Sequence, residues 1–223
     1  MGPLASAFVT DQLESEKRDA ARAAAALVSD GQLVGLGTGS TVAYLLPALA
    51  ERQLAIRCVA TSPDTEERAR ELGLEVLSFT GVDRLNIAID GADQVDLDGW
   101  LVKGGGGAHT REKVVAAAAD RFVVIVSSDK IVDRIGPPIP LELLAFGIDA
   151  TIAALGTVSL RDAPVSPDGG VIADFRDSFE DRAAFAARLD ATPGVIGHGI
   201  FAPKLCADVL IARAGELEHR VLR

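Results

Sequence analysis

The sequence predicts an α/β fold in which a parallel sheet is covered by helices on both faces, followed by a second, smaller α+β unit. Apolar runs of strand length alternate with helical patterns as far as residue 128. The strands are nearly unbroken apolar runs, as expected where both faces of a parallel sheet are buried. This alternation changes at IGPPIP, residues 135–140, where three prolines within four residues indicate a domain boundary.

The first unit is expected to contain an N-terminal helix followed by strands and helices in alternation. Residues 11–31 form an amphipathic pattern that ends at Gly31, which is typical of a helix C-terminus. The expected strands are 32–37, 55–60, 74–79, 85–90, 100–103 and 121–128. The expected helices between them are 38–52, 65–73 and 108–119.

The second unit follows the prolines and shows shorter elements that suit antiparallel pairing. Its expected helices are 147–155 and 178–189, and its expected strands are 157–161, 170–175 and a region around 194–202. The run ADVLIAR, residues 207–213, is fully apolar and is expected to return to the first sheet. We therefore divide the chain into residues 1–135 plus 207–223, and residues 136–206.

Composition and charge exclude several classes of protein. The 223 residues are 48% hydrophobic and 24% charged, which is typical of a globular protein. The net charge of −10 argues against a nucleic-acid partner. Cys58 and Cys206 are too few for a disulfide scaffold or a zinc site and are expected to be buried thiols. No secretory pattern or membrane-spanning run is present, so we expect a cytoplasmic protein without a membrane partner.

The stretch GLGTGST, residues 35–41, lies where a strand ends and a helix begins. Free N–H groups at a helix N-terminus bind phosphate or carboxylate groups, and the Ser40 and Thr41 hydroxyls would add hydrogen bonds. Position 40 is serine where a dinucleotide fingerprint requires glycine, and no lysine follows as in a Walker A loop. We interpret this stretch as an anion-binding loop, with an ordinary capped turn as the alternative.

Four aspartates occur in DGADQVDLDGW, residues 90–100. An EF-hand is excluded, because the register that fits the turn glycine places glutamine and glycine at ligand positions. Asp90 and Asp93 directly follow a buried strand, at the edge where open α/β sheets bind ligands. Carboxylates there suit sugar hydroxyls, from which they accept hydrogen bonds or protons. Asp96 and Asp98 are interpreted as part of a solvated turn.

The stretch KGGGGAHTREK, residues 103–113, joins a strand to a helix through four glycines. Ordering four glycines costs conformational entropy, which is expected where the backbone must approach a ligand closely. Lys103 and the N–H groups of this loop would form an oxyanion site, with Glu112 nearby as a base. Together they suit removal of a proton beside a carbonyl group. The alternative is that Glu112 belongs to a solvated helix face.

The histidines and Lys130 are less informative. His109, His198 and His219 show no metal-binding spacing with one another or with the cysteines, so no metal site is expected. Lys130 ends SSDK, residues 127–130, at the end of a strand. It is either a surface charge or a phosphate partner.

The chain resembles ribose-5-phosphate isomerase of type A over nearly its whole length. The resemblance rests, in order, on VGLGTGST, DGADQVD, LVKGGGGAHTREKVV, SSDK and TPGVIGHGIFAPKLCADVLI. It implies a homodimeric, metal-independent enzyme without cofactors that interconverts ribose 5-phosphate and ribulose 5-phosphate in the pentose phosphate pathway. It also implies a Rossmann-like domain and a small ferredoxin-like α+β domain, with the last segment returning to the first domain.

The resemblance also implies roles for individual residues. Asp90 and Asp93 match a pair that contacts the sugar and assists ring opening, and Glu112 matches the catalytic base. Lys103 begins the substrate-binding glycine loop and joins these catalytic residues. The other substrate-binding residues implied are Thr38, Gly39, Ser40, Thr41, Gly91, Ala92, Gly104, Gly105, Gly106, Lys130 and, from the first helix, Lys17, which would lie near the phosphate.

The expected mechanism is proton transfer through a cis-enediolate. After ring opening assisted by Asp90 or Asp93, Glu112 would move a proton from carbon 2 to carbon 1 while Lys103 and the glycine loop hold the oxygen. Two alternatives of other kinds are a sugar-phosphate sensor and a related amino-sugar-phosphate deaminase or CoA transferase. A sensor needs an output such as a DNA-binding segment, and this acidic chain offers no basic segment for one. The set of Asp90, Asp93, Lys103 and Glu112 fits the isomerase better than the related enzymes.

Overall fold

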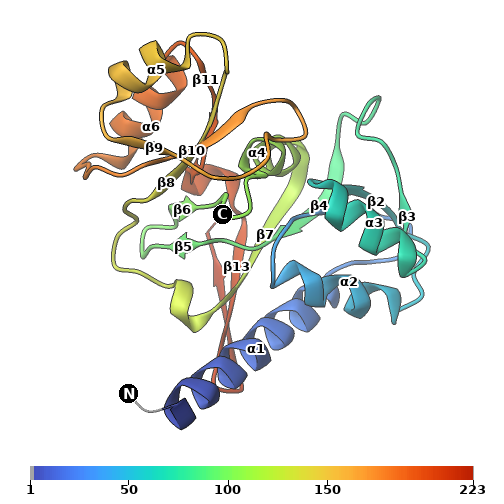
Figure 1. Cartoon of the computed structure of the whole chain (residues 1–223). Coiled ribbons are helices and arrows are strands. Elements are labelled where there is room, and N and C mark those ends of the chain that lie inside the picture. Colours follow the sequence, from blue (N-terminus) through green and yellow to red (C-terminus); the bar gives the residue numbers. More distant parts are fainter. Residues whose placement is uncertain (1–2, 223) are drawn as a thin grey trace.

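A seven-stranded sheet forms the centre of the larger unit in the computed structural model, which describes residues 3–222 (Figure 1). Its strands are β1 (Leu33–Leu36), β2 (Arg57–Ala60), β3 (Glu75–Val76), β4 (Leu85–Asp90), β7 (Ala119–Ser127), β13 (Asp208–Arg213) and β14 (Glu216–Val221). They follow the order β14-β13-β7-β4-β1-β2-β3, and only the β13–β14 pair is antiparallel. This order, which reverses direction between β1 and β4, gives a Rossmann-like α/β domain.

Helices cover both faces of this sheet, as the apolar strands predicted. The helices are α1 (Pro3–Ala25), α2 (Val42–Ala50), α3 (Pro63–Glu71) and α4 (His109–Ala118). Within β7, Val123 and Ile125 join the hydrophobic cluster to which α1, α2 and α3 contribute. Phe122 and Val124 join the cluster to which α4 contributes on the other face. Residues 122–126 of this strand are therefore all apolar, because each face meets a different layer.

The smaller unit is a four-stranded antiparallel sheet with two helices. Its elements in chain order are β8 (Ile139–Leu143), α5 (Ile148–Leu155), β9 (Val158–Leu160), β10 (Val171–Phe175), α6 (Arg182–Ala191) and β11 (Val195–His198). The strand order is β11-β8-β10-β9. This β-α-β-β-α-β arrangement is ferredoxin-like, and its core forms a hydrophobic cluster of its own.

A third, small sheet corrects one expectation about the parallel sheet. It contains β5 (Gln94–Val95), β6 (Leu101–Val102) and β12 (Ile200–Phe201) in the order β12-β6-β5, with antiparallel pairs. The strand expected at 100–103 therefore forms but lies outside the parallel sheet. The described residues also form two short 3-10 helices, η1 (Ser128–Lys130) and η2 (Pro203–Leu205). The return of the segment 207–213 to the first sheet is confirmed, because β13 lies between β7 and β14.

Several helix ends differ from the sequence expectation, and the contacts of two of them explain the difference. Helix α1 ends at Ala25 and not at Gly31. The Arg52 guanidinium donates to the carbonyl oxygens of Ala25 and Val28, so a distant side chain satisfies the end of the helix. Helix α6 begins at Arg182, because the Asp181 carboxylate caps it by accepting from two N–H groups of the first turn.

Asp96 is buried, so its assignment to a solvated turn was wrong. Its carboxylate accepts hydrogen bonds from the N–H groups of Asp98 and Trp100 at 3.0 and 2.9 Å and forms an ion pair with Arg182. Asp96 thus ties the turn before β6 to the smaller unit. Asp98 remains exposed, as expected. No helix in the described part of the chain has the length and apolar character needed to cross a membrane.

Candidate active site

The loops that follow β1, β4 and β7 meet at one edge of the sheet and enclose a cavity of about 230 Å³. This edge is the carboxyl end of the parallel strands, at the point between β1 and β4 where the strand order reverses. Open α/β sheets bind ligands at that point, because the loops diverge there and leave a crevice. The cavity is lined by Thr38, Gly39, Ser40, Thr41, Gly91, Ala92, Asp93, Lys103, Gly104, Gly105, Gly106, Glu112 and Lys130.

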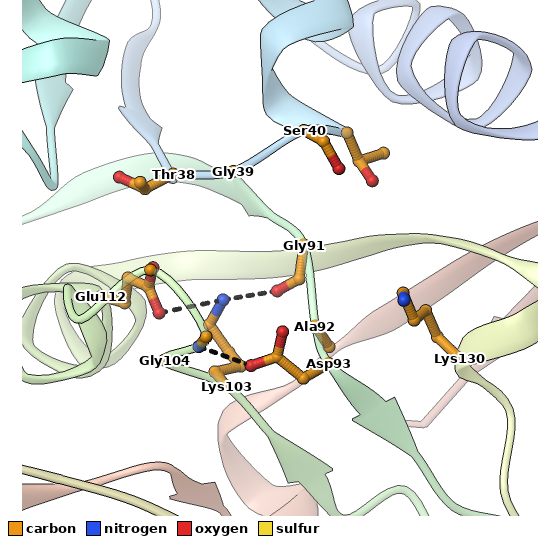
Figure 2. A pocket seen from close by; sticks show the side chains of 13 residues that line it. Thr38, Gly39, Ser40, Gly91, Ala92, Asp93, Lys103, Gly104, Glu112 and Lys130 are labelled. Atoms are coloured by element: carbon orange, nitrogen blue, oxygen red, sulfur yellow. Dashed lines mark hydrogen bonds and ion pairs between the residues drawn. The ribbon is translucent and has the colours of Figure 1, made fainter. Parts of the chain in front are cut away.

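All of these lining residues were singled out from the sequence. Figure 2 shows Glu112 and Lys130 toward opposite ends of the cavity, with Lys103 and Asp93 between them. Two further residues singled out from the sequence do not line it. Asp90 lies buried beneath the cavity, and Lys17 of α1 lies outside its lining, in an ion pair with Glu14 at 2.6 Å.

Asp90 joins the loop after β1 to the loop after β4. Its Oδ1 accepts hydrogen bonds from the N–H groups of Thr38 at 3.1 Å and Gly91 at 2.7 Å. A Cβ atom at Gly37 would overlap the Asp90 side chain, so the glycine leaves the space that this carboxylate occupies. The Thr38 hydroxyl is bonded to the Thr61 hydroxyl at 2.8 Å. Asp90 therefore organises the cavity from below.

The ammonium group of Lys103 has three partners, two carboxylates in ion pairs and one carbonyl oxygen in a hydrogen bond. Nζ lies 2.9 Å from Asp90 Oδ2. It also lies 3.2 Å from Glu112 Oε2 and donates to the Gly91 carbonyl oxygen (Figure 2). The Lys103 side chain is only 2% exposed. Burial alone would lower the pKa of Lys103, but the two carboxylates outweigh it and raise the pKa above the ordinary value. Lys103 is therefore a fixed cation in the floor of the cavity.

Glu112 lies in the first turn of α4 and is 4% exposed. Burial raises the pKa of its carboxyl group to about 8, and the charge of Asp90 adds to this effect, while Lys103 acts against it. Burial likewise raises the pKa of Asp90, against the lowering effect of Lys103 and of two backbone N–H groups. A carboxylate in such a position is a stronger base than a solvated glutamate and suits proton abstraction near neutral pH.

The glycine loop faces Asp93 on the cavity side. The Gly105 N–H donates to Asp93 Oδ2 at 2.7 Å, while no hydrogen bond within residues 3–222 uses the N–H groups of Gly104 or Gly106. Gly104 has a φ of +104°, and a Cβ there would overlap the ring of buried His109. Burial lowers the pKa of His109 to about 3, so a neutral ring supports the loop from beneath.

The loop after β1 offers backbone donors at the N-terminus of α2. Among the described residues, the N–H groups of Gly39, Ser40, Thr41 and Val42 have no hydrogen-bond acceptor. These groups carry the positive end of the helix dipole and suit an anion. Lys130 of η1 lines the same cavity, with its ammonium 2.8 Å from Asp129. The cavity thus combines an end whose free N–H groups suit an anion with an end that holds the carboxylate and ammonium groups.

Glu16 of α1 supports this site and was not singled out from the sequence. Its buried carboxylate accepts from the Ser128 N–H at 2.8 Å, the Ser128 hydroxyl at 2.7 Å and the Ala214 N–H at 3.0 Å. It therefore holds the turn that carries Lys130. The available signal was its spacing of four and eight residues from Ala20 and Ala24, which places an acid on the apolar face of the helix.

A larger cavity of about 550 Å³ lies on another side of α4, and its residues offer less chemistry. Its wall includes the exposed ion pairs Arg70–Glu66 and Arg111–Asp168 and apolar side chains such as Phe79. No buried carboxylate or ammonium group lies among its lining residues. Within the described residues, no three His, Cys, Asp or Glu side chains are close enough to hold a metal ion. The smaller cavity is therefore the candidate active site.

Known proteins resemble this chain throughout the region that forms the site. The family model of ribose 5-phosphate isomerase A (phosphoriboisomerase A) matches residues 57–216. Ribose-5-phosphate isomerase A of Gluconobacter oxydans is 40% identical over an alignment of 220 positions, which covers 91% of this chain and 95% of that protein. The crystal structure of ribose 5-phosphate isomerase A from Neisseria gonorrhoeae superimposes with a TM-score of 0.90 at 29% identity, covering 95% and 98% of the two chains.

A further solved structure has a ligand. It is a D-ribose-5-phosphate isomerase in complex with phospho-erythronic acid, with a TM-score of 0.88 and 32% identity. The similarity covers 94% of this chain and 99% of that one.

Proposed function

We infer the chemistry of the cavity from one premise, which is that this chain belongs to the ribose 5-phosphate isomerase A family. It is an aldose–ketose isomerase that interconverts D-ribose 5-phosphate and D-ribulose 5-phosphate. We propose that Glu112 is the base of this reaction and that Lys103 stabilises the charge that develops on the substrate. The observation that supports this most directly is that both buried groups line one cavity in contact with each other.

The proposed step moves one negative charge within the reach of one ammonium group. Glu112 takes the proton from carbon 2 of the open-chain sugar, so its own charge disappears as an enediolate oxygen becomes negative. Lys103, which neutralises the carboxylate before the step, then neutralises that oxygen. Because the site is buried, this fixed cation acts in a low dielectric and needs little reorganisation. The proton of the 2-hydroxyl group passes to the oxygen on carbon 1, and Glu112 returns its own proton to carbon 1, which leaves the carbonyl group at carbon 2.

The substrate is proposed to lie along the cavity with its phosphate toward α2. The unpaired N–H groups of residues 39–42 and the side chain of Lys130 support this placement. Asp93 lines the cavity and is proposed to contact the sugar hydroxyls or assist ring opening, whereas Asp90 acts through Lys103 and the two loops. Phospho-erythronic acid bound to a similar protein supports a phosphorylated sugar as the ligand. Lys17 lies outside the cavity lining, so its contact with the phosphate stays a prediction.

The assembly and location are also proposals. We propose a homodimer, supported by apolar side chains that the smaller unit exposes, namely Leu144, Phe146 and Leu160 at 47%, 87% and 52% exposure. We also propose that the enzyme works in the cytoplasm as part of the pentose phosphate pathway, as the family resemblance implies. Light scattering of the purified protein would measure the mass of the assembly directly.

The decisive experiment for the mechanism is conversion of ribose 5-phosphate in deuterated water. An enediolate step lets the proton on Glu112 exchange with solvent, so deuterium is expected at carbon 1 of the ketose. Ketose that retains all of the original hydrogen would contradict exchange through Glu112 and favour a hydride shift. A protein that binds the sugar phosphate without producing ketose would instead be a sensor.

A further inference from the structure

Arg161 contacts the glycine loop from outside the catalytic cavity. It follows β9 in the smaller unit and is not among the residues that line the catalytic cavity. It lines a separate cavity of about 320 Å³, whose wall also includes Gly105 and Gly106. The glycine loop is therefore a thin partition, with the substrate site on one side and Arg161 on the other.

The guanidinium of Arg161 binds two consecutive carbonyl groups of this partition. Its Nη1 donates to the carbonyl oxygens of Gly104 and Gly105, both at 2.9 Å. The Gly107 N–H also donates to the Gly104 oxygen, at 3.0 Å. Arg161 is itself oriented by Asp174, which accepts from Nε at 3.1 Å and from Nη2 at 2.7 Å. The Asp174 side chain is 8% exposed, so this pair is well shielded.

These contacts determine where the N–H groups of the loop point. In a trans peptide, the C=O and N–H groups of one unit point in opposite directions. Since the Gly104 carbonyl faces Arg161, the Gly105 N–H points away from it, and there it meets Asp93 at 2.7 Å. The Gly105 carbonyl faces Arg161 as well, so the Gly106 N–H also points away from it. Gly106 lines the catalytic cavity, and its N–H has no acceptor within residues 3–222.

We propose that Arg161 is a positioning residue that presents the Gly106 N–H to the substrate oxygen. Glycine tolerates several backbone conformations, so the two peptide units have little intrinsic preference for this orientation. The hydrogen bonds from the charged Arg161 guanidinium to the two carbonyl oxygens favour this orientation before substrate binds. The inference rests on the proposed function of the cavity, because the Gly106 N–H matters only if an oxygen becomes negative there.

The chain supplies a matched control in Arg176. Its Nη2 lies 3.2 Å from Asp174 Oδ2, so it shares the carboxylate partner of Arg161. Among the described residues, its side chain donates to Ser159 and Asp174 and to no residue of the glycine loop. Replacing Arg176 by alanine therefore reproduces the loss of a cation beside Asp174 without touching the catalytic partition.

The kinetic experiment compares Arg161→Ala, Arg161→Lys and Arg176→Ala with the wild type. Misplacement of reacting groups costs about 10²-fold, so Arg161→Ala is expected to lower kcat by roughly that factor while KM changes little. Arg161→Lys retains one charged donor and is expected to recover part of the loss. Arg176→Ala is expected to keep the wild-type kcat. Equal kcat values for Arg161→Ala and Arg176→Ala would overturn the proposal.

A second measurement does not depend on turnover. Amide hydrogen exchange of Gly105 and Gly106, followed by NMR, is expected to be faster in Arg161→Ala than in Arg176→Ala, because the peptide units can then rotate. Unchanged exchange would overturn the positioning role even if activity fell. If Glu112→Gln retained wild-type turnover, the proposed base would be wrong, while the exchange comparison would still decide whether Arg161 orients the loop.

Discussion

The Lys103 ammonium lies 3.2 Å from the Glu112 carboxylate, with the two side chains only 2% and 4% exposed. The same ammonium lies 2.9 Å from Asp90. One buried cation therefore balances two buried acids, and removing any of the three changes the charge of a poorly solvated site. Several consequences for rate, pH dependence and stability can be measured.

Glu112→Gln is expected to lower kcat by at least about 10²-fold, because the amide cannot accept the carbon-2 proton. KM for ribose 5-phosphate should change little, since the amide fills the same space. Ketose formation with each variant measures both constants. Glu66→Gln, which removes a partly exposed carboxylate from α3, serves as the control. Wild-type turnover in Glu112→Gln would remove Glu112 from its role.

The pH dependence of kcat/KM should report the ionisation of Glu112 in the free enzyme. The base must be ionised to act, and burial raises its pKa to about 8. We therefore expect kcat/KM to rise with pH through neutrality and to level off above about pH 8. A rate already constant from pH 5 upward would show that the group titrates as an ordinary solvated glutamate.

The same shift in pKa makes stability depend on pH. Between the ordinary value of 4.5 and about 8, the folded chain retains a proton on Glu112 that the unfolded chain has lost. Stability contributed by this group therefore decreases as pH rises through that window. Glu112→Gln removes this dependence. The free energy of unfolding of the variant minus that of the wild type should therefore increase by at least about 1 kcal/mol from pH 5 to pH 8.5. Urea unfolding of both proteins at both pH values measures this difference. The same pH dependence in the variant and the wild type would contradict the prediction.

Lys103→Met is expected to abolish most turnover and to destabilise the fold. Breaking a buried ion pair costs about 3–5 kcal/mol, because the partner charge is left uncompensated. The loss should be greatest at high pH, where both carboxylates tend to ionise. Adding Asp90→Asn and Glu112→Gln to Lys103→Met should restore much of the stability but no activity. If Lys103→Met raised only KM, the lysine would bind substrate without stabilising the enediolate.

Gly37→Ala should disturb the site through Asp90. The new methyl group would overlap the Asp90 side chain, and overpacking of this kind costs about 1–3 kcal/mol. Displacing Asp90 also weakens its bond to the Thr38 N–H and its pairing with Lys103, so activity should fall as well. Gly136→Ala is the control, because no atom lies within 4 Å of its added Cβ. The melting temperature and the rate of ketose formation are measured for both variants, and both quantities should fall only in Gly37→Ala.

The sequence predicted where the buried strands lie in the chain better than it predicted which strands pair with each other. The segment LNIAID agrees with β4 residue for residue, because a long apolar run between turns has few alternatives. The segment at 100–103 is equally apolar, yet it pairs with β5 and β12 outside the main sheet. Strand β14 was not predicted, because Glu216, Glu218 and Arg220 make it read as polar surface. An apolar pattern indicates that a strand is buried, whereas the strands it pairs with depend on the rest of the chain.

The candidate site was largely predictable because its residues follow strand ends in short motifs. What the motifs did not reveal are contacts over long sequence separations. Asp96 was assigned to a solvated turn, since its partner Arg182 is distant in the chain. The contact of Arg161 with the glycine loop was not predicted, because nothing near Arg161 in the sequence indicates it. Lys17 illustrates the opposite case, in which a residue named by resemblance lies outside the cavity lining.

The position of β13 has a consequence for synthesis on the ribosome. Residues 208–213 lie beside β7, and Glu16 bonds both to Ser128 and to Ala214. Until those late residues leave the exit tunnel, β7 presents an apolar, unpaired edge, and the turn bearing Lys130 lacks part of its support. Nascent chains in which these residues have not yet emerged are thus expected to bind chaperones and to aggregate, and the catalytic crevice is complete only after residues 208–214 have left the ribosome.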